Sequence, residues 1–294
     1  MITTFIPYFY RAMKIPQKLA LRYARARINI LALSSTRKAA IKAYRLFCTP
    51  QQKVPAKTSP LFRKGEKLTL RYDGHKIRGH CWLPDEPPVK KILIAHGFES
   101  ASRHFDSYIA ALVDKGYTVM AFDAPAHGGS GGGRITLPAY INVLRLIEQT
   151  YGPFEAYLGH SLGALALTLF LETSPHNETT RLVLIAPAVE MTSALASFAG
   201  LLGLSVDVVR EMDTYAQEVG GHHFAWYSLR RALQGVHAGV FYLQDQDDRI
   251  TPLKDALLVQ KDGRYNIRFL FTRGLGHRKI LKDPATLDQV LAFL

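Results

Sequence analysis

Apolar positions between residues 66 and 294 fall into short runs separated by longer amphipathic stretches. Runs 67–72 and 76–83 flank Asp73-Gly74, a pair that favours a hairpin turn. The same pattern predicts strands at 91–95, 117–122, 154–159, 181–186, 240–243 and 267–271, and helices at 107–115, 138–150, 164–172, 253–261 and 286–294. A hairpin followed by strand–helix alternation predicts a mostly parallel central sheet with helices on both faces.

One segment, residues 188–235, interrupts this alternation. It is long, helical in character and rich in large apolar residues, and it stands where a short connection would suffice. We expect a cap inserted after the sixth strand that acts as a lid or a substrate-pocket element. The alternative is a helical decoration that only completes the fold.

The charge of the chain is concentrated at its beginning. The sequence has 37 Lys and Arg and 24 Asp and Glu, but residues 1–65 hold 14 of the basic residues and no acidic one. The remaining residues are therefore close to neutral, which argues against a nucleic-acid-binding body. We expect residues 1–60 to form a basic helical extension and linker, and residues 61–294 to form the main domain.

Helical spacing in this basic leader separates apolar from basic residues. The apolar positions are Leu19, Tyr23, Ala26, Ile30 and Leu33 in a first helix and Ala40, Tyr44 and Phe47 in a second; the basic positions are Lys18, Arg22, Arg25, Lys38, Lys42 and Arg45. Two alternatives compete closely: the apolar faces pack on the body, which is slightly favoured, or residues 1–50 lie on an anionic membrane. A transit peptide is a third alternative. Residues 49–60, with three prolines, are typical of a linker.

Other features limit the setting in which the protein acts. No stretch of eighteen apolar residues occurs, and the first sixteen residues lack a signal-peptide pattern. Cys48 and Cys81 are the two cysteines, too few for a disulfide framework and without a metal-ligand spacing. We expect a cytoplasmic protein, peripheral to a membrane if the leader binds lipid, that uses no cofactor and no metal.

The best chemical signal is Gly159-His160-Ser161-Leu162-Gly163, a G-x-S-x-G pattern. A predicted strand leads into it and a helical run leads out, so Ser161 is expected on a sharp strand-to-helix turn that holds its hydroxyl out of the sheet, at the positive end of a helix. The non-catalytic alternative is a helix-capping serine in a tight turn.

Candidate partners of Ser161 also follow strands. Asp248 comes after the run 240–243, and His277 comes after 267–271. All three residues are therefore expected at one edge of the sheet, in an order known for Ser–Asp–His triads. His96-Gly97-Phe98 follows the strand 91–95, and the backbone N–H groups of Phe98 and Leu162 are expected to form an oxyanion hole.

With these motifs, residues 66–294 resemble the α/β-hydrolase family. The resemblance rests on His96-Gly97, on Gly159 to Gly163, on Asp248 with Pro252, on Gly276-His277, and on the turn from Asp123 to Gly128, which is similar to the family's D-x-P-G-x-G. It implies Ser161 as nucleophile, Asp248 as acid, His277 as base and a cap at 188–235. The chain looks closest to the serine esterase, lysophospholipase and monoacylglycerol-lipase-like branches. It departs from the family at Ala126, where a glycine is usual.

The expected activity is a cofactor-free serine hydrolase that cleaves carboxylic esters, lipid-like or small, through an acyl-enzyme. A thioesterase or an amidase of the same fold stays open, as does a non-catalytic protein that binds a ligand or a membrane. Rivals for the acid are Asp245, Asp247 and Glu190. Asp248 is preferred because Pro252 stands four residues after it, as the resemblance implies.

Overall fold

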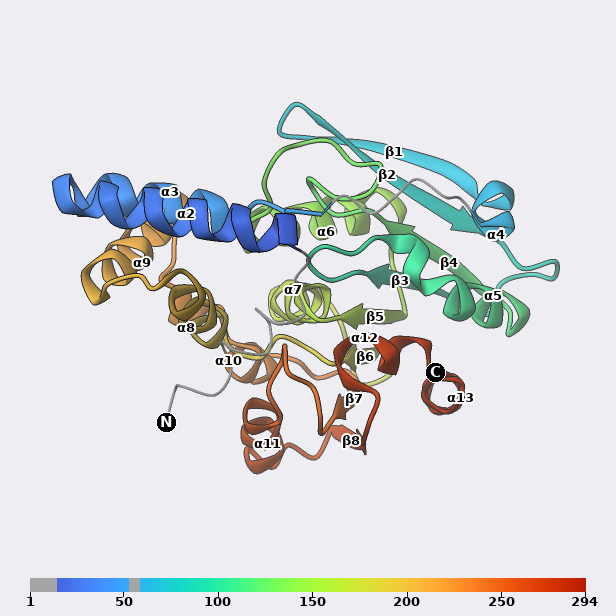
Figure 1. The fold of residues 1–294 in the computed structure, drawn as a ribbon. Helices are drawn as coiled ribbons and strands as arrows, with labels where there is room; N and C mark the ends of the chain where they lie inside the picture. The colour runs from blue at the N-terminus through green and yellow to red at the C-terminus, as the bar shows by residue number, and fades with distance from the viewer. Residues whose placement is uncertain (1–14, 53–58) are drawn as a thin grey trace. The chain divides into compact units, whose positions relative to one another are not determined.

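The computed structural model describes residues 15–52 and 59–294, and the chain folds into two compact units (Figure 1). The smaller unit contains the leader up to Thr49 together with Glu190–Ser228, and the larger contains Pro50–Val189 and Leu229–Leu294. The leader thus shares a unit with the insertion, although the two are far apart in the sequence. Residues 1–14 and half of the predicted linker, 53–58, lie outside the described residues.

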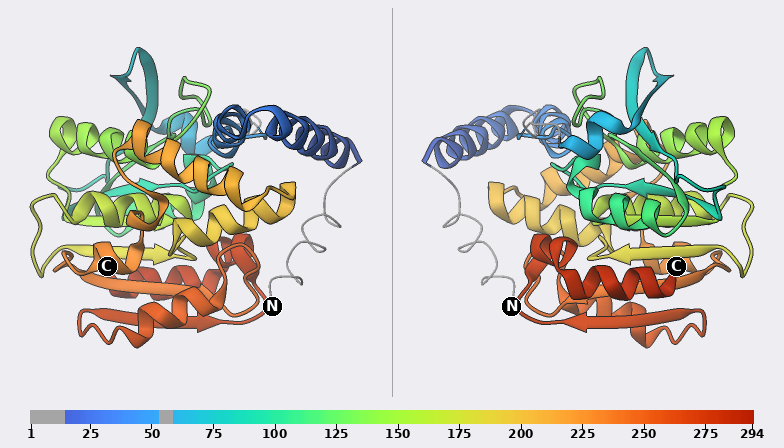
Figure 2. Two further views of the ribbon diagram at one scale, coloured as in Figure 1. Left: turned by 90° about the vertical axis from the view of Figure 1, so that its left-hand side faces the viewer. Right: turned by 90° about the vertical axis from the view of Figure 1, so that its right-hand side faces the viewer.

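The larger unit is built on an eight-stranded sheet with the order β1-β2-β4-β3-β5-β6-β7-β8. The β1–β2 hairpin lies at one edge and β8 at the other (Figures 1 and 2). β1 and β2 are antiparallel, β2 is antiparallel to β4, and all later pairs are parallel. The strands are β1 (Glu66–Tyr72), β2 (His75–Trp82), β3 (Lys90–Ala95), β4 (Tyr117–Phe122), β5 (Ala156–His160), β6 (Arg181–Ile185), β7 (Gly239–Asp245) and β8 (Ile267–Thr272). The predicted mostly parallel sheet is confirmed, as is its opening hairpin.

Alternating side chains divide the core into two layers. On one face, Ile94, Leu158 and Val183 belong to an apolar cluster with residues of α5 and α13. On the other, Tyr157 donates to Glu148 of α6 and packs on Phe170 of α7. The helices of this unit are α4 (Pro60–Lys64), α5 (Asp106–Asp114), α6 (Leu137–Tyr151), α7 (Leu162–Leu171), α10 (Leu229–Leu233), α11 (Leu253–Lys261), α12 (Gly276–Lys279) and α13 (Pro284–Phe293), with 3₁₀ turns η1 (Ser102–Phe105) and η3 (Ile280–Lys282).

The smaller unit pairs two leader helices with the insertion that follows β6. Its elements are α2 (Ile15–Ser34), α3 (Thr36–Phe47), α8 (Met191–Leu202), α9 (Val206–Gly220) and η2 (Phe224–Trp226). Phe47 of α3 lies edge-on to Phe198 and Phe224, with ring centroids 5.1 and 5.6 Å away. Arg37 forms ion pairs with Glu211, at 2.7 Å, and with Glu218. Apolar packing and complementary charge therefore both join the leader to α8, α9 and η2.

The two leader helices use their apolar stripes differently. In α3 the predicted stripe packs inward, with Ala40 and Tyr44 buried and Phe47 half-buried. In α2 it is exposed, and the helix packs instead through another face that contains Ile28. The expectation that the leader packs through its apolar stripes therefore fails for α2. Among the described helices, none is long and apolar enough to cross a membrane.

Candidate active site

Ser161 occupies a strained turn between β5 and α7. Its φ of 54° lies in a region that side chains other than glycine rarely adopt. The backbone holds this conformation on two sides, because Ser161 N–H donates to Ile185 O of β6 and Ser161 O accepts from Ala188 N–H, each at 3.1 Å. The strain turns the side chain out of the sheet at the first turn of α7.

Glycines let the chain pass closely around this turn. A Cβ at Gly159 would lie 2.5 Å from Ala164 Cα, and one at Gly163 would lie 2.4 Å from Ala95 O. Both collisions are with backbone, which cannot move aside cheaply. The close approach of the neighbouring elements therefore explains why the motif has glycine at these two positions.

The structure brings Ser161, His277 and Asp248 into one hydrogen-bonded chain. His277 Nε2 lies 3.0 Å from Ser161 Oγ, and His277 Nδ1 lies 2.8 Å from Asp248 Oδ2. All three side chains are buried. With the proton on Nδ1 donated to the carboxylate, Nε2 is free to accept the proton of the serine hydroxyl. A base placed in this way can activate an oxygen nucleophile.

The surroundings of Asp248 favour its ionised form. Its Oδ1 accepts the N–H groups of Ile250 and Thr251 at 2.7 and 3.0 Å, and its Oδ2 accepts the Thr251 hydroxyl at 2.7 Å. Gln244 Nε2 adds a longer bond to Oδ2 at 3.3 Å. Burial alone would raise the pKa of Asp248, but the hydrogen bonds and the interaction with His277 hold that pKa below its ordinary value.

The rival carboxylates serve other groups. Asp245 Oδ2 accepts from the Thr272 hydroxyl and from Leu275 N–H, and Asp247 Oδ2 accepts from Gly274 N–H. Both acids therefore brace the loop that carries His277. Glu190 lies in the smaller unit, where it accepts a hydrogen bond from Ser228. Of the four carboxylates considered, Asp248 is the one that binds the imidazole of His277.

The predicted oxyanion donors stand beside the serine in different ways. Leu162 is the first residue of α7, so its N–H lies outside the hydrogen-bond ladder of that helix. A Cβ at Gly97 would lie 2.8 Å from Ser161 Cβ, which shows how closely the loop before Phe98 approaches the nucleophile. No backbone partner accepts Phe98 N–H in the part of the chain that the structure describes. Leu162 N–H is therefore outside the helix ladder, and the loop that carries Phe98 passes close to Ser161.

Two buried histidines fix the loop that carries Phe98. His96 Nδ1–H donates to Gly97 O at 2.8 Å, and His96 Nε2 accepts Ala124 N–H at 2.9 Å. His127 Nε2 accepts Glu99 N–H at 3.0 Å while its Nδ1–H donates to Pro125 O. Burial lowers the pKa of His96 to about 4 and also lowers that of His127, so both rings are neutral at pH 7. The loop of residues 96–99 is therefore tied to the turn after β4.

That turn contains Ala126, at a position where the resemblance leads us to expect glycine. Ala126 has a φ of 65°, the left-handed conformation that a glycine adopts without strain. Asp123 stabilises the turn through Gly129 N–H and the Ser102 hydroxyl, both at 2.8 Å. Ala126 thus adopts a conformation that favours glycine, the residue that the resemblance leads us to expect at this position.

His160, directly before the serine, links the two loops of the site. Its Nε2–H donates to His277 O at 2.9 Å, and its Nδ1 is buried without a partner among the described residues. Burial, together with the nearby His277, lowers the pKa of His160 to about 3. The ring is therefore neutral at pH 7. This contact holds the backbone of the base at a set distance from the nucleophile turn.

Several supporting residues were not expected from the sequence. Thr251, Gln244, His127 and His160 carry no spacing that distinguishes them from other polar loop residues. The position of Thr251 between Asp248 and Pro252 is the one sequence feature that could have pointed to its role. In the adjacent pair His222-His223, His222 stacks on Trp226 at 3.9 Å and His223 bonds Asp213. Within residues 15–52 and 59–294, no cluster of three or more His, Cys, Asp or Glu could hold a metal ion.

Comparison with known proteins gives partial matches in sequence. A family model described as serine aminopeptidase, S33, matches residues 86–214, which include Phe98 and Ser161. An uncharacterized abhydrolase domain-containing protein of Dictyostelium discoideum is 30% identical over 144 residues. That alignment covers 46% of this chain and 15% of the relative, so the chain spans only a small part of that protein.

Solved structures match over most of the chain. An esterase of Pyrococcus furiosus superposes with a TM-score of 0.62 at 18% identity, over 84% of this chain and 97% of the esterase. A thioesterase domain from the curacin biosynthetic pathway gives a TM-score of 0.56 at 16% identity, over 78% of this chain and 99% of the domain. At these identities the likeness concerns the fold alone.

Proposed function

We propose that this chain, which belongs to the α/β-hydrolase fold family, is a serine hydrolase that cleaves carboxylic esters through an acyl-enzyme. The observation that carries the proposal is the hydrogen-bonded chain from Asp248 through His277 to Ser161. A buried chain of this kind has a cost, since Ser161 is held at a strained φ and Asp248 is a buried charge. Strain and buried charge at one point are typical of a reactive site.

Acylation begins at Ser161 and involves the hydrogen-bonded His277 as base. Ser161 Oγ attacks the carbonyl carbon of the ester while its proton moves to His277 Nε2. The negative charge that develops on the carbonyl oxygen is stabilised by the N–H groups of Leu162 and Phe98. The imidazolium then donates its proton to the leaving alcohol, and the carbon–oxygen bond breaks to leave an acyl-Ser161.

Deacylation repeats these steps with water. His277 Nε2 accepts a proton from a water molecule that attacks the acyl carbon, and the same two N–H groups hold the oxyanion. The tetrahedral intermediate collapses, the proton returns to Ser161 Oγ and the carboxylic acid leaves. Asp248 stays ionised throughout and steadies the imidazolium in both halves.

The choice of ester rests on chemistry and on the structural neighbours. An alcohol leaves without the strong protonation that an amine requires, so the arrangement found here suffices for esters. An esterase and a thioesterase domain both share this fold. The same groups serve thioesters and amides, and comparison of the three leaving groups on one acyl chain separates these activities.

The test is covalent labelling with a fluorophosphonate probe, followed by a panel of p-nitrophenyl esters from short to long acyl chains. We expect label on the wild type and none on Ser161→Ala, with ester hydrolysis lost in the same variant. Ser197→Ala, which alters an exposed serine of α8, is the matched control and should keep both. A wild type that takes no label would favour a ligand-binding protein, and label that survives in Ser161→Ala would show that Ser161 is not the reactive nucleophile.

A further inference from the structure

α2 carries two apolar faces, of which only one is used inside its unit. Ile28 is 1% exposed and packs inward. Leu19, Tyr23, Ile30 and Leu33 are 59%, 62%, 67% and 89% exposed. Their spacing of four, seven and three residues places them on one side of the helix, with the exposed Ala26 between them. A continuous apolar stripe of this length on a helix surface indicates a binding surface for another molecule.

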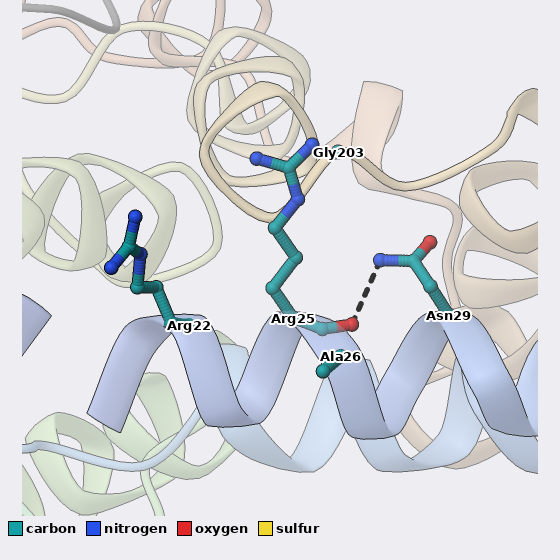
Figure 3. A pocket seen from close by; sticks show the side chains of 5 residues that line it. All are labelled: Arg22, Arg25, Ala26, Asn29 and Gly203. Carbon is teal, nitrogen blue, oxygen red and sulfur yellow. Dashed lines mark hydrogen bonds between the residues drawn. The ribbon is translucent and has the colours of Figure 1, made fainter. Parts of the chain in front are cut away.

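Basic residues border this exposed stripe on both sides. Arg22 and Arg25 lie along one border, and Arg27 lies along the other, where its guanidinium group contacts Tyr23. Figure 3 shows the side chains of Arg22, Arg25 and Asn29 rising from the same side of α2, with the guanidinium group of Arg25 beside Gly203. Together with Ala26 these residues line a hollow of about 420 Å³. The hollow therefore adjoins the stripe and presents two guanidinium groups.

The charge of these border arginines is not neutralised within the described chain. Residues 1–65 contain no Asp or Glu. Arg37 of α3 is paired with Glu211 and Glu218, but no ion pair of the described residues involves Arg22 or Arg25. The exposed face of α2 thus combines apolar side chains with unneutralised positive charge.

We propose that α2 binds the surface of an anionic phospholipid membrane. Leu19, Ile30 and Leu33 enter the boundary between headgroups and acyl chains, and Tyr23 lies at the headgroup level. Arg22 and Arg25 contact lipid phosphate groups at the hollow, because a guanidinium group matches two phosphate oxygens at once. The helix lies in the membrane plane rather than across it.

Charge decides between this occupant and a second copy of the chain. Two copies of α2 paired along the exposed stripe would bring Arg22, Arg25 and Arg27 of one helix against the same residues of the other. With no carboxylate on the helix to interleave, such a pair is repelled. An anionic lipid surface supplies both an apolar layer and negative charge. The lipid surface is therefore the occupant that satisfies both properties of the stripe.

The experiment measures co-sedimentation of the full chain with vesicles of phosphatidylcholine alone and with about one-third phosphatidylglycerol, at about 0.05 M and 0.5 M salt. We expect binding to the anionic vesicles at low salt and weaker binding at high salt. Arg22→Gln with Arg25→Gln should weaken it about thirtyfold, since each basic residue near such a surface contributes roughly fivefold. Leu19→Ser with Ile30→Ser and Leu33→Ser should weaken it roughly tenfold or more.

Matched controls alter similar residues of the larger unit. Lys254→Gln with Lys261→Gln removes two exposed cations, and Leu83→Ser with Val89→Ser and Tyr265→Ser removes three exposed large apolar groups. Both controls should bind as the wild type does. Because every altered side chain is exposed, thermal unfolding should stay unchanged, and Leu33→Ser alone serves if the triple variant is destabilised.

Three results would overturn the proposal: no sedimentation of the wild type with anionic vesicles at low salt, equal binding by the α2 variants, or equal loss in the controls. If the chain instead dimerises through the stripe, or binds an acidic protein while ignoring vesicles, the lipid assignment is wrong. None of these readouts depends on hydrolysis, so the result is independent of the proposed activity.

Discussion

The hydroxyl of Thr251 donates to Asp248 Oδ2 at 2.7 Å, and this is the same carboxylate oxygen that binds His277. The hydroxyl therefore helps to fix the carboxylate at the angle that orients the imidazole. Thr251→Val keeps the shape of the side chain and removes this donor. We expect kcat for ester hydrolysis to fall about ten- to a hundredfold, by analogy with outer residues that orient a functional group.

Thr251→Ser is the control for this prediction, because it restores the hydroxyl without the methyl group. It should recover most of the lost kcat, with KM nearly constant in both variants. If the serine and valine variants are equally impaired, Thr251 acts through packing and the orientation argument is wrong.

Asp248→Asn should leave the fold intact and remove most of the activity. The amide can donate to His277 Nδ1, which would place the imidazole proton on Nε2 and prevent that atom from accepting from Ser161. A fall in kcat of about 10⁴ is expected from this change. Glu190→Gln, measured beside it, should keep full activity. The opposite ranking of the two variants would move the acid to Glu190.

Ala126→Gly should stabilise the protein. Alanine at a φ of 65° has a conformational cost of about 1–2 kcal/mol, which glycine avoids at a smaller loss of chain entropy. The free energy of unfolding in denaturant should rise by about 0.5–1 kcal/mol. Ala110→Gly, in the interior of α5, should lower it by about 1 kcal/mol. A loss of stability in Ala126→Gly would show that alanine is not strained at this position.

The buried histidines should make the fold sensitive to mild acid. Burial lowers the pKa of His160 to about 3 and that of His96 to about 4, whereas an unfolded histidine titrates near about 6.5. Between these values the unfolded chain binds protons that the folded chain does not, so stability falls as pH falls. The slope for each such histidine approaches about 1.4 kcal/mol per pH unit.

Denaturant unfolding between pH 7.5 and 4.5 measures this slope. His160→Asn should flatten it, whatever its effect on stability at pH 7.5. His75→Asn, at an exposed position of β2, should leave it as in the wild type. Identical slopes in all three proteins would mean that His160 binds its proton equally well in both states.

Phe47→Ala should loosen the smaller unit. Phe47 is half-buried against Phe198 and Phe224, so its truncation should cost that unit roughly 2 kcal/mol. Limited proteolysis should then cut within residues 190–228 as well as within the leader. Leu33→Ala, in the same leader but exposed, should leave the cleavage pattern unchanged. Cleavage restricted to the leader would show that the insertion is ordered without it.

The sheet and the site could be read from the sequence because their signals are local. Each strand is a short apolar run, and Ser161, Asp248 and His277 each follow one, so parallel pairing brings them to one edge. The outward face of α2 could not be read in this way. Leu21 and Ile28 form one apolar face and Leu19 and Ile30 another, and periodicity does not say which one packs. The role of Thr251 could not be predicted for a similar reason, since it depends on the position of one oxygen atom.

The pairing of the leader with the insertion sets an order of events during synthesis. Arg37 and its partner Glu211 are 174 residues apart, and the whole sheet as far as β6 is made between them. A ribosome that adds about 5–20 residues per second leaves α3 without α9 for roughly ten seconds or more. During that interval Tyr44 and Phe47 lack their aromatic neighbours Tyr215 and Phe198, so their rings stay uncovered until the insertion has been made.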